Sequence, residues 1–406
     1  MTGISTPPAT SRATAWGAWF LTLLLLATPI LAWLAPRAYA PLVGVAGLLA
    51  LPAFRVRDSD RPAAIAILVI VVWACGSVAW SPYVARNLGQ STAAKLVVQA
   101  MLYGSAIAAA RQASDQVRRW LLLALVWGMV GLSLMMLVEA ASGAGLYRAL
   151  RIALGDPIRP DLAIKNVAQA LFILALFAPA AVVAAGRVAG SMWLGLPILA
   201  GIVWPSILFT YDAPLVALAA SALAMGLLWV WPRLGPRLLA ILAAGFFLGA
   251  PSLVWATRKL GWFDRLQASV SLSWSQRMGY WRHAQDWIAD HPARGWGLDA
   301  SRMFAPGIQL HPHDAALQIW LELGLIGAVG AAVLWAVILA GMGRPRRDGA
   351  VAASAGCAVA YLTFNAVSFG IWQEWWLALG ALACAVCAAL QRQPARGEST
   401  LGPILG

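Results

Sequence analysis

The residues of this chain that are best suited to acid–base chemistry lie in one polar stretch, residues 257–324. All four histidines of the sequence occur there. His313 is the strongest candidate for a general base, because imidazole accepts a proton near neutral pH. It precedes a predicted helix that Asp314 can cap, and the positive end of that helix favours the neutral ring. We therefore predict a catalytic role for His313 and a supporting role for His311; the alternative is a histidine that only forms hydrogen bonds within a loop.

The helix that follows His313 carries a second polar feature. Asp314, Gln318 and Glu322 recur every four residues, so they share one face of the helix. Glu322 lies about 12 Å along it. A carboxylate at that depth of an apolar helix is costly unless it faces protein or water. We predict that Asp314 and Glu322 support the site; the alternative is that Glu322 only bonds to a neighbouring helix.

Arginines in the polar stretch suit the capture of phosphate, because the planar guanidinium group binds two oxygens at once. The candidates for binding phosphate are Arg265, Arg277, Arg282, Arg294 and Arg302. Some arginines of the stretch must pair with neighbouring carboxylates instead, and Asp299 is counted among the supporting residues for that reason.

A second basic loop, residues 141–165, contributes Arg159 and Lys165 as further candidates. Asn166 is a good N-cap and is predicted to open the next helix, where a helix N-terminus and Lys165 would suit an anion. The alternative is an arginine cluster that contacts lipid headgroups. No glycine-rich phosphate loop and no convincing metal-ligand spacing occurs, so neither a metal nor another cofactor is expected. A nucleic-acid partner is not expected either.

The rest of the chain must position these residues within a membrane. The sequence is 61% hydrophobic and 11% charged, whereas a soluble protein has about 25% charged residues. Continuous apolar runs of this length predict an all-α polytopic membrane protein. About twelve spans are expected, at residues 15–35, 38–54, 62–80, 92–110, 120–140, 166–186, 190–210, 213–231, 237–256, 314–341, 349–369 and 371–390.

This pattern divides the chain into four parts. Residues 1–256 hold nine spans and the basic outer loop at 141–165, and residues 257–313 form a large outer loop. Residues 314–390 hold three spans, and 391–406 form a tail. An even number of spans puts both termini on one side, and the larger net positive charge of the loops on that side makes it the cytoplasmic one.

Part of the large outer loop is expected to be helical. Ser273 and Gln276 fit a capping box. Met278, Trp281, Ala284 and Ile288 follow at helical spacing, on the apolar face of a helix that is expected to lie at the membrane interface, half in lipid.

Several segments resemble the shared signature of O-antigen ligases and O-antigen polymerases. They are Ser275-Gln-Arg277 with Trp281, Pro292-Ala-Arg-Gly295-Trp-Gly297, and the run from His311-Pro-His313 through Glu322-Leu-Gly324 to Gly327. Lys165-Asn166-Val-Ala is similar to the ligase pattern. The resemblance covers the topology loosely and residues 265–330 more specifically, and the length and the large late outer loop are closest to the ligases.

The resemblance implies inverting, metal-independent glycosyl transfer at the periplasmic face of the bacterial inner membrane, among its lipids. The donor would be O-antigen polysaccharide on undecaprenyl diphosphate, and the acceptor a sugar hydroxyl of lipid A–core. His313 would be the base that acts on the acceptor hydroxyl, and Arg265 and its neighbours would hold the diphosphate.

The chain departs from the family pattern at two places. Asp314 stands where members often have Asn, and Tyr211-Asp212 stands where many have Ser-Arg. An arginine is therefore missing from that turn or is supplied elsewhere, with Arg159 as a candidate. An O-antigen polymerase is the nearest alternative, followed by a protein O-oligosaccharyltransferase. A lipid-linked sugar transporter is less favoured, because charges occur mainly at the ends of the spans.

Overall fold

The computed structural model describes residues 12–391, and every regular element in that range is a helix, as predicted. The first α-helices are α1 (Arg12–Leu26), α2 (Thr28–Leu34), α3 (Tyr39–Leu49), α4 (Arg61–Ser77), α5 (Thr92–Gln112), α6 (Asp115–Ser142), α7 (Gly145–Ala153), α8 (Pro160–Val167) and α9 (Gln169–Val188). The others are α10 (Gly195–Leu208), α11 (Asp212–Val230), α12 (Gly235–Lys259), α13 (Trp262–Ser269), α14 (Leu272–Asp290), α15 (Ala315–Ala340), α16 (Gly349–Val367) and α17 (Glu374–Gln391). Short 3-10 helices are η1 (Pro36–Ala38), η2 (Leu51–Ala53), η3 (Asp58–Asp60), η4 (Val78–Trp80), η5 (Leu88–Gln90), η6 (Met192–Leu194) and η7 (Ala300–Met303).

The number of membrane spans is smaller than the twelve expected. Among the described residues, nine helices are long and apolar enough to cross a membrane, or ten if the bent pair α1–α2 counts as one span. This confirms the polytopic all-α class but not the count. The tail expected at 391–406 lies almost entirely outside the described residues.

Three expected spans differ from the prediction, because hydropathy does not register apolar turns. The run at 15–35 bends by 63° between α1 and α2, where Pro29 lies in the first turn of α2 and disfavours a continuous helix. The run at 38–54 contains the 11-residue α3, about 16 Å long, against a hydrocarbon layer of ~30 Å. The run at 190–210 forms only the shorter helix Met192–Leu208.

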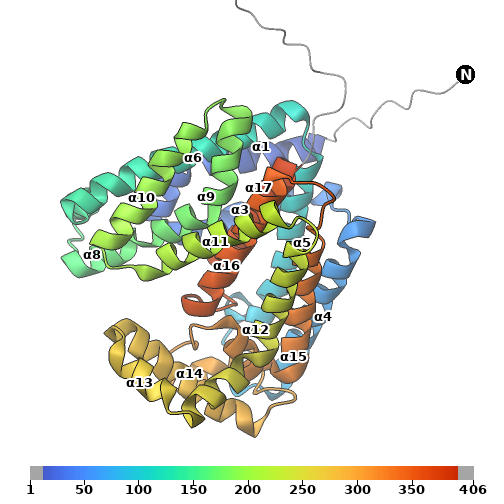
Figure 1. Cartoon of the computed structure of the whole chain (residues 1–406), viewed down its shortest axis with the longest axis vertical. Coiled ribbons are helices and arrows are strands. Elements are labelled where there is room, and N and C mark those ends of the chain that lie inside the picture. Colours follow the sequence, from blue (N-terminus) through green and yellow to red (C-terminus); the bar gives the residue numbers. More distant parts are fainter. Residues whose placement is uncertain (1–11, 392–406) are drawn as a thin grey trace, which may run out of the picture.

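The connections between helices gather at two ends of the bundle. We call one end the site face; its segments are residues 78–91, 143–159, 209–211, 260–314 and 368–373. Contacts between these segments and the helix ends beside them include Trp274 Nε1 to Asp212 Oδ2 at 3.4 Å and Lys95 Nζ to Glu374 Oε1 at 2.7 Å. The opposite face brings together other ends, as the 3.3 Å contact between Arg187 and Asp348 shows. In Figure 1, α13 and α14 lie at the lower left, below α8.

The most buried span is the one formed by α8 and α9, with 83% of its apolar window buried inside the protein. Its α9 part packs against α6, α10, α11 and α16, whereas α8, which carries the exposed Lys165, contacts α2, α7 and α9. Asn166 does not open a helix as expected. It lies in the last turn of α8, and its side-chain amide donates to the Tyr147 hydroxyl at 3.3 Å.

The large outer loop folds into α13, α14 and η7 before it reaches α15. Met278, Ala284 and Ile288 form one buried face of α14, as their spacing predicted, but this face packs against α12 and α15 rather than against lipid. The predicted capping box does not form, because α14 begins earlier, at Leu272, with Ser271 at the N-cap position and no side-chain cap. Since α14 packs against α12 and α15, its residues reach the N-terminal end of α15.

Candidate active site

His313 lies in the loop before α15 with one ring nitrogen held by the backbone of another helix end. Its Nδ1 lies 2.6 Å from the carbonyl oxygen of Ser368, just after α16. A carbonyl oxygen can only accept, so Nδ1 carries the hydrogen and the lone pair of the neutral ring is on Nε2. Tyr280 of α14 stacks on the ring at a centroid distance of 6.0 Å. The half-buried imidazole is thereby oriented with Nε2 as its proton acceptor.

The surroundings of His313 keep the imidazole neutral. Burial lowers its pKa, the hydrogen bond to Ser368 opposes this shift, and the positive charges of Arg277 and Lys165 add to it. A lowered pKa leaves the ring unprotonated near neutral pH, as a base requires. The sequence predicted the neutral form, but its leading cause is burial rather than the end of α15.

His311 supports the backbone at His313. Its Nδ1 accepts the His313 N–H at 3.2 Å, and the two rings lie 4.2 Å apart. His313 has a φ of +56°, a conformation that costs free energy for a side-chain-bearing residue and needs such support. Burial, the neighbouring His313 and Arg302 lower the pKa of His311 to about 3. His311 is therefore neutral and acts as a fixed acceptor.

Asp314 caps α15 as predicted, since its Oδ1 accepts the Leu317 N–H at 2.9 Å. Burial raises the pKa of Asp314 to about 7, and the N–H groups of Leu317 and Ala316 oppose that shift. The cap fixes the point at which the chain leaves His313 and enters the helix.

Glu322 is completely buried and joins three segments of the site face. Its Oε1 accepts from Ser301 Oγ at 2.6 Å and from Gln318 Nε2 at 3.1 Å. Its Oε2 accepts the Asp299 N–H at 2.9 Å and the Trp372 indole N–H at 2.6 Å. Four donors on one carboxylate offset the cost of burying it. Glu322 thus holds the η7 loop and the 368–373 segment against α15.

A break in α15 at Gly324 lets the polar loop bond directly to the helix. Gly324 has φ +64° and ψ −160°, which interrupts the helical hydrogen bonds. The freed carbonyl oxygens of Leu321, Glu322 and Leu323 accept from Trp296 N at 2.8 Å, Gly297 N at 2.7 Å and Trp73 Nε1 at 2.9 Å.

Gly295, in the turn at residues 292–297, is required by this contact. A Cβ on Gly295 would lie 2.5 Å from the backbone of Glu322, and Gly295 has a φ of +68°. The Leu325 N–H, freed by the same break, donates to Pro292 O at 2.9 Å. The sequence pointed to both segments through the resemblance, but not to the hydrogen bonds between them.

Of the predicted cations, Arg277 and Lys165 act on His313. Arg277 lies over the Trp274 ring at 5.0 Å, and the Trp274 indole donates to Asp212. Burial lowers the pKa of Arg277, while Tyr211 and Asp212 oppose the shift. Arg277 therefore supplies a guanidinium group at the Tyr211-Asp212 turn, where the sequence lacks one.

The other predicted arginines are engaged elsewhere or exposed. Arg159, the candidate for that turn, forms a two-point ion pair with Asp161 at 3.0 and 3.1 Å. Arg282 pairs with Asp264 and also bonds to Gln267. Arg265 is exposed on α13. Asp299 pairs with Arg302 at 3.0 Å. Within the described range, no group of three or more His, Cys, Asp or Glu side chains is arranged to hold a metal ion.

Sequence reasoning missed the partners that orient the histidines, namely Ser368, Tyr280 and Gln373, whose side-chain amide lies 3.1 Å from His311 Nε2. It also missed the contribution of residues 82–99, which bring Arg86 and Lys95 to the site face. Their positive charge could have indicated a functional role, because short outer loops of membrane proteins usually contain few lysines and arginines.

The fold and this site define a polytopic helical membrane protein with one buried and one half-buried histidine near cations at one end of the bundle. Residues 207–332 match the sequence model of the family described as O-antigen ligase. The chain is therefore similar to O-antigen ligases over this segment, which contains Tyr211, Arg277, His313 and Glu322.

Similar proteins carry related names. Two proteins, of Rickettsia conorii and Rickettsia prowazekii, are each 29% identical over 120 residues, which is 26% of this chain and 29% or 30% of the relative. A protein of Rickettsia bellii is 39% identical over 71 residues, 18% of this chain and 17% of the relative. All three are named "Putative polysaccharide ligase". The matched part is thus less than a third of each relative's length.

Proposed function

We propose that this chain transfers a saccharide from a lipid diphosphate to a sugar hydroxyl at its site face. The donor is O-antigen polysaccharide on undecaprenyl diphosphate, and the acceptor is lipid A–core. The observation that supports this best is the neutral His313 imidazole, with Nδ1 held by Ser368 and with Arg277 and Lys165 beside it. The similarity of residues 207–332 to O-antigen ligases supports the same reaction class.

In the proposed step, Nε2 of His313 accepts the proton of the acceptor hydroxyl while that oxygen bonds to the anomeric carbon of the donor. The bond between the anomeric carbon and the diphosphate oxygen breaks, and its electron pair stays on the diphosphate. Arg277 and Lys165 stabilise that negative charge. Attack opposite to the leaving group inverts the configuration, and the imidazolium then gives its proton to the diphosphate or to water.

We also propose that the site face is periplasmic in the bacterial inner membrane, with both termini in the cytoplasm. The excess of positive charge in the connections of the opposite face supports this orientation. Single cysteines introduced at the exposed positions His283 and Arg55 test it in intact cells. A membrane-impermeant thiol reagent should label the first and not the second; the reverse result would contradict the orientation.

The transfer itself is tested with purified protein in liposomes, given the lipid-linked donor and lipid A–core. His313→Ala should reduce transfer by about 100-fold or more while donor binding persists. The matched control is His283→Ala, an exposed histidine of α14, which should transfer at the wild-type rate. Transfer by His313→Ala near that rate would remove His313 as the base. Product formed on a second donor molecule instead of lipid A–core would identify a polymerase.

A further inference from the structure

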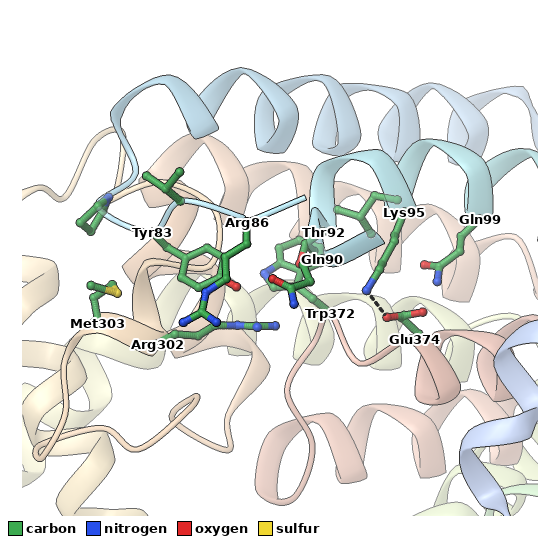
Figure 2. A pocket seen from close by; sticks show the side chains of 13 residues that line it. Tyr83, Arg86, Gln90, Thr92, Lys95, Gln99, Arg302, Met303, Trp372 and Glu374 are labelled. Atoms are coloured by element: carbon green, nitrogen blue, oxygen red, sulfur yellow. Dashed lines mark hydrogen bonds and ion pairs between the residues drawn. The ribbon is translucent and has the colours of Figure 1, made fainter. Parts of the chain in front are cut away.

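A polar cavity lies at the site face, and neither His311 nor His313 lines it. Its volume is about 660 Å³, and it opens between the segment around residues 82–99, η7 and the start of α17. Figure 2 shows the side chains of Arg86, Gln90 and Lys95 directed into this space from one side and Trp372 and Arg302 bordering it from the other. Nothing in the proposed reaction step uses this cavity.

The cavity carries an excess of positive charge. Arg86, Lys95 and Arg302 line it, against the single carboxylate of Glu374. Lys95 pairs with Glu374 at 2.7 Å, and Arg302 pairs with Asp299 at 3.0 Å. No carboxylate of residues 12–391 forms an ion pair with Arg86. A cavity with an uncompensated guanidinium group suits a negatively charged ligand.

The remaining lining suits a sugar. Gln90, Gln99 and Thr92 offer both donors and acceptors, which match the hydroxyl groups of a saccharide. Trp372 uses its indole N–H on Glu322, so its ring is held as a rigid wall, and Tyr83 is held under the Arg302 guanidinium group at 5.2 Å. Flat apolar faces beside a few convergent polar groups are typical of sites for small polar ligands.

The cavity is connected to the histidine pair through its own lining. Trp372 and Arg302 belong to the two segments that Glu322 holds against α15. Arg302 lowers the pKa of His311, whereas Arg277 and Lys165 act on His313. Two separate groups of cations therefore act on the two histidines. A transfer between two substrates needs two binding sites, and each group of cations can belong to one of them.

We propose that this cavity binds an anionic saccharide of the acceptor, with Arg86 as the residue that recognises its negative charge. The inference rests on the proposed function, and it assigns Arg277 and Lys165 to the donor and the cavity to the acceptor.

Arg86→Gln tests the proposal without leaving a carboxylate unpaired. The variant should raise the KM for lipid A–core about tenfold, the effect of one charge-assisted hydrogen bond, with kcat and the donor KM unchanged. Arg86→Lys should recover part of the loss. The control is Arg55→Gln, an exposed arginine of the opposite face, which should leave both KM values unchanged. A rise in the donor KM, or no change in either KM, would overturn the assignment.

A binding measurement separates this proposal from the reaction. His313→Ala protein in detergent should bind lipid A–core, and adding Arg86→Gln should weaken that binding about tenfold. Lipid A–core stripped of phosphate should bind weakly to both proteins. If binding depends on Arg86 but the wild type transfers nothing, the proposed reaction fails while the site stands. If transfer occurs but the affinity for lipid A–core depends on neither Arg86 nor phosphate, the proposed acceptor site is wrong while the proposed reaction stands.

Discussion

His313 Nδ1 and the Ser368 carbonyl oxygen lie 2.6 Å apart, although the residues are 55 positions apart in the sequence. This contact joins the loop before α15 to the end of α16. It fixes both the tautomer and the orientation of the one imidazole that we assign to proton transfer. The chemistry of the site thus depends on the packing of two helices as well as on the loop.

The pH dependence of transfer should report the neutral state of His313. Because its pKa is lowered, activity should fall only at a pH below 6.5, the ordinary pKa of imidazole. A nearby positive charge disfavours the imidazolium form, so Arg277→Gln should move the acidic midpoint of kcat to higher pH. The other groups that surround the His313 ring, namely His311, Tyr280 and Lys165, are unchanged in this variant. Arg55→Gln should not move the midpoint, and an unchanged midpoint in Arg277→Gln would contradict the assignment.

Two arginines of α14 should differ sharply in their effect on transfer. Arg277 acts on His313 and faces the Tyr211-Asp212 turn, whereas Arg282 is paired with Asp264 and Gln267. Arg277→Ala should lower kcat by about 100-fold, the usual loss for a group that stabilises developing charge. Arg282→Ala should have a small effect. Equal losses in steady-state assays would show that Arg277 has no special position toward the diphosphate.

Glu322 should matter for stability as well as for activity. Glu322→Ala leaves the N–H of Asp299, the Trp372 indole and the Ser301 hydroxyl without their acceptor. Breaking a buried charged network costs about 3–5 kcal/mol, so the midpoint of thermal unfolding in detergent should fall strongly. Glu374→Gln removes a half-exposed ion pair, worth at most ~1 kcal/mol, and is the comparison. Similar midpoints for the two variants would show that Glu322 does not hold the segments together.

Gly295 and Gly245 offer a matched test of the turn that bonds to α15. Gly295→Ala would place a Cβ 2.5 Å from the Glu322 backbone at a positive φ, so the unfolding temperature should fall clearly. Gly245 lies within α12, and a Cβ there meets nothing within 4 Å. Gly245→Ala should therefore preserve or slightly raise the unfolding temperature. A tolerated Gly295→Ala would mean that the turn can move away from the helix.

Local patterns predicted the all-helical class, the Asp314 cap and the shared face of Gln318 and Glu322, because each depends on spacing along one helix. The partners of Glu322 could not be predicted, since Trp372 and Ser301 reach it through tertiary packing. The same holds for Arg277 at the Tyr211-Asp212 turn, where α14 and α11 meet. Helix ends were predicted least well, because the turn after α3, residues 50–53, is itself apolar and continues the hydropathy of the helix.

The interruption at Gly324 bears on how deep the proposed site would lie in the membrane. The uninterrupted part of α15 after it, residues 325–340, is about 24 Å long at 1.5 Å per residue. This is less than the ~30 Å thickness of the hydrocarbon layer. In the proposed orientation, the residues of α15 just before the break would complete the crossing, and the turn bonded to them would lie below the level of the lipid headgroups, covered by protein. In the proposed reaction, a lipid carrier would then bring its headgroup to the site by lateral diffusion, while its tail stays in the bilayer.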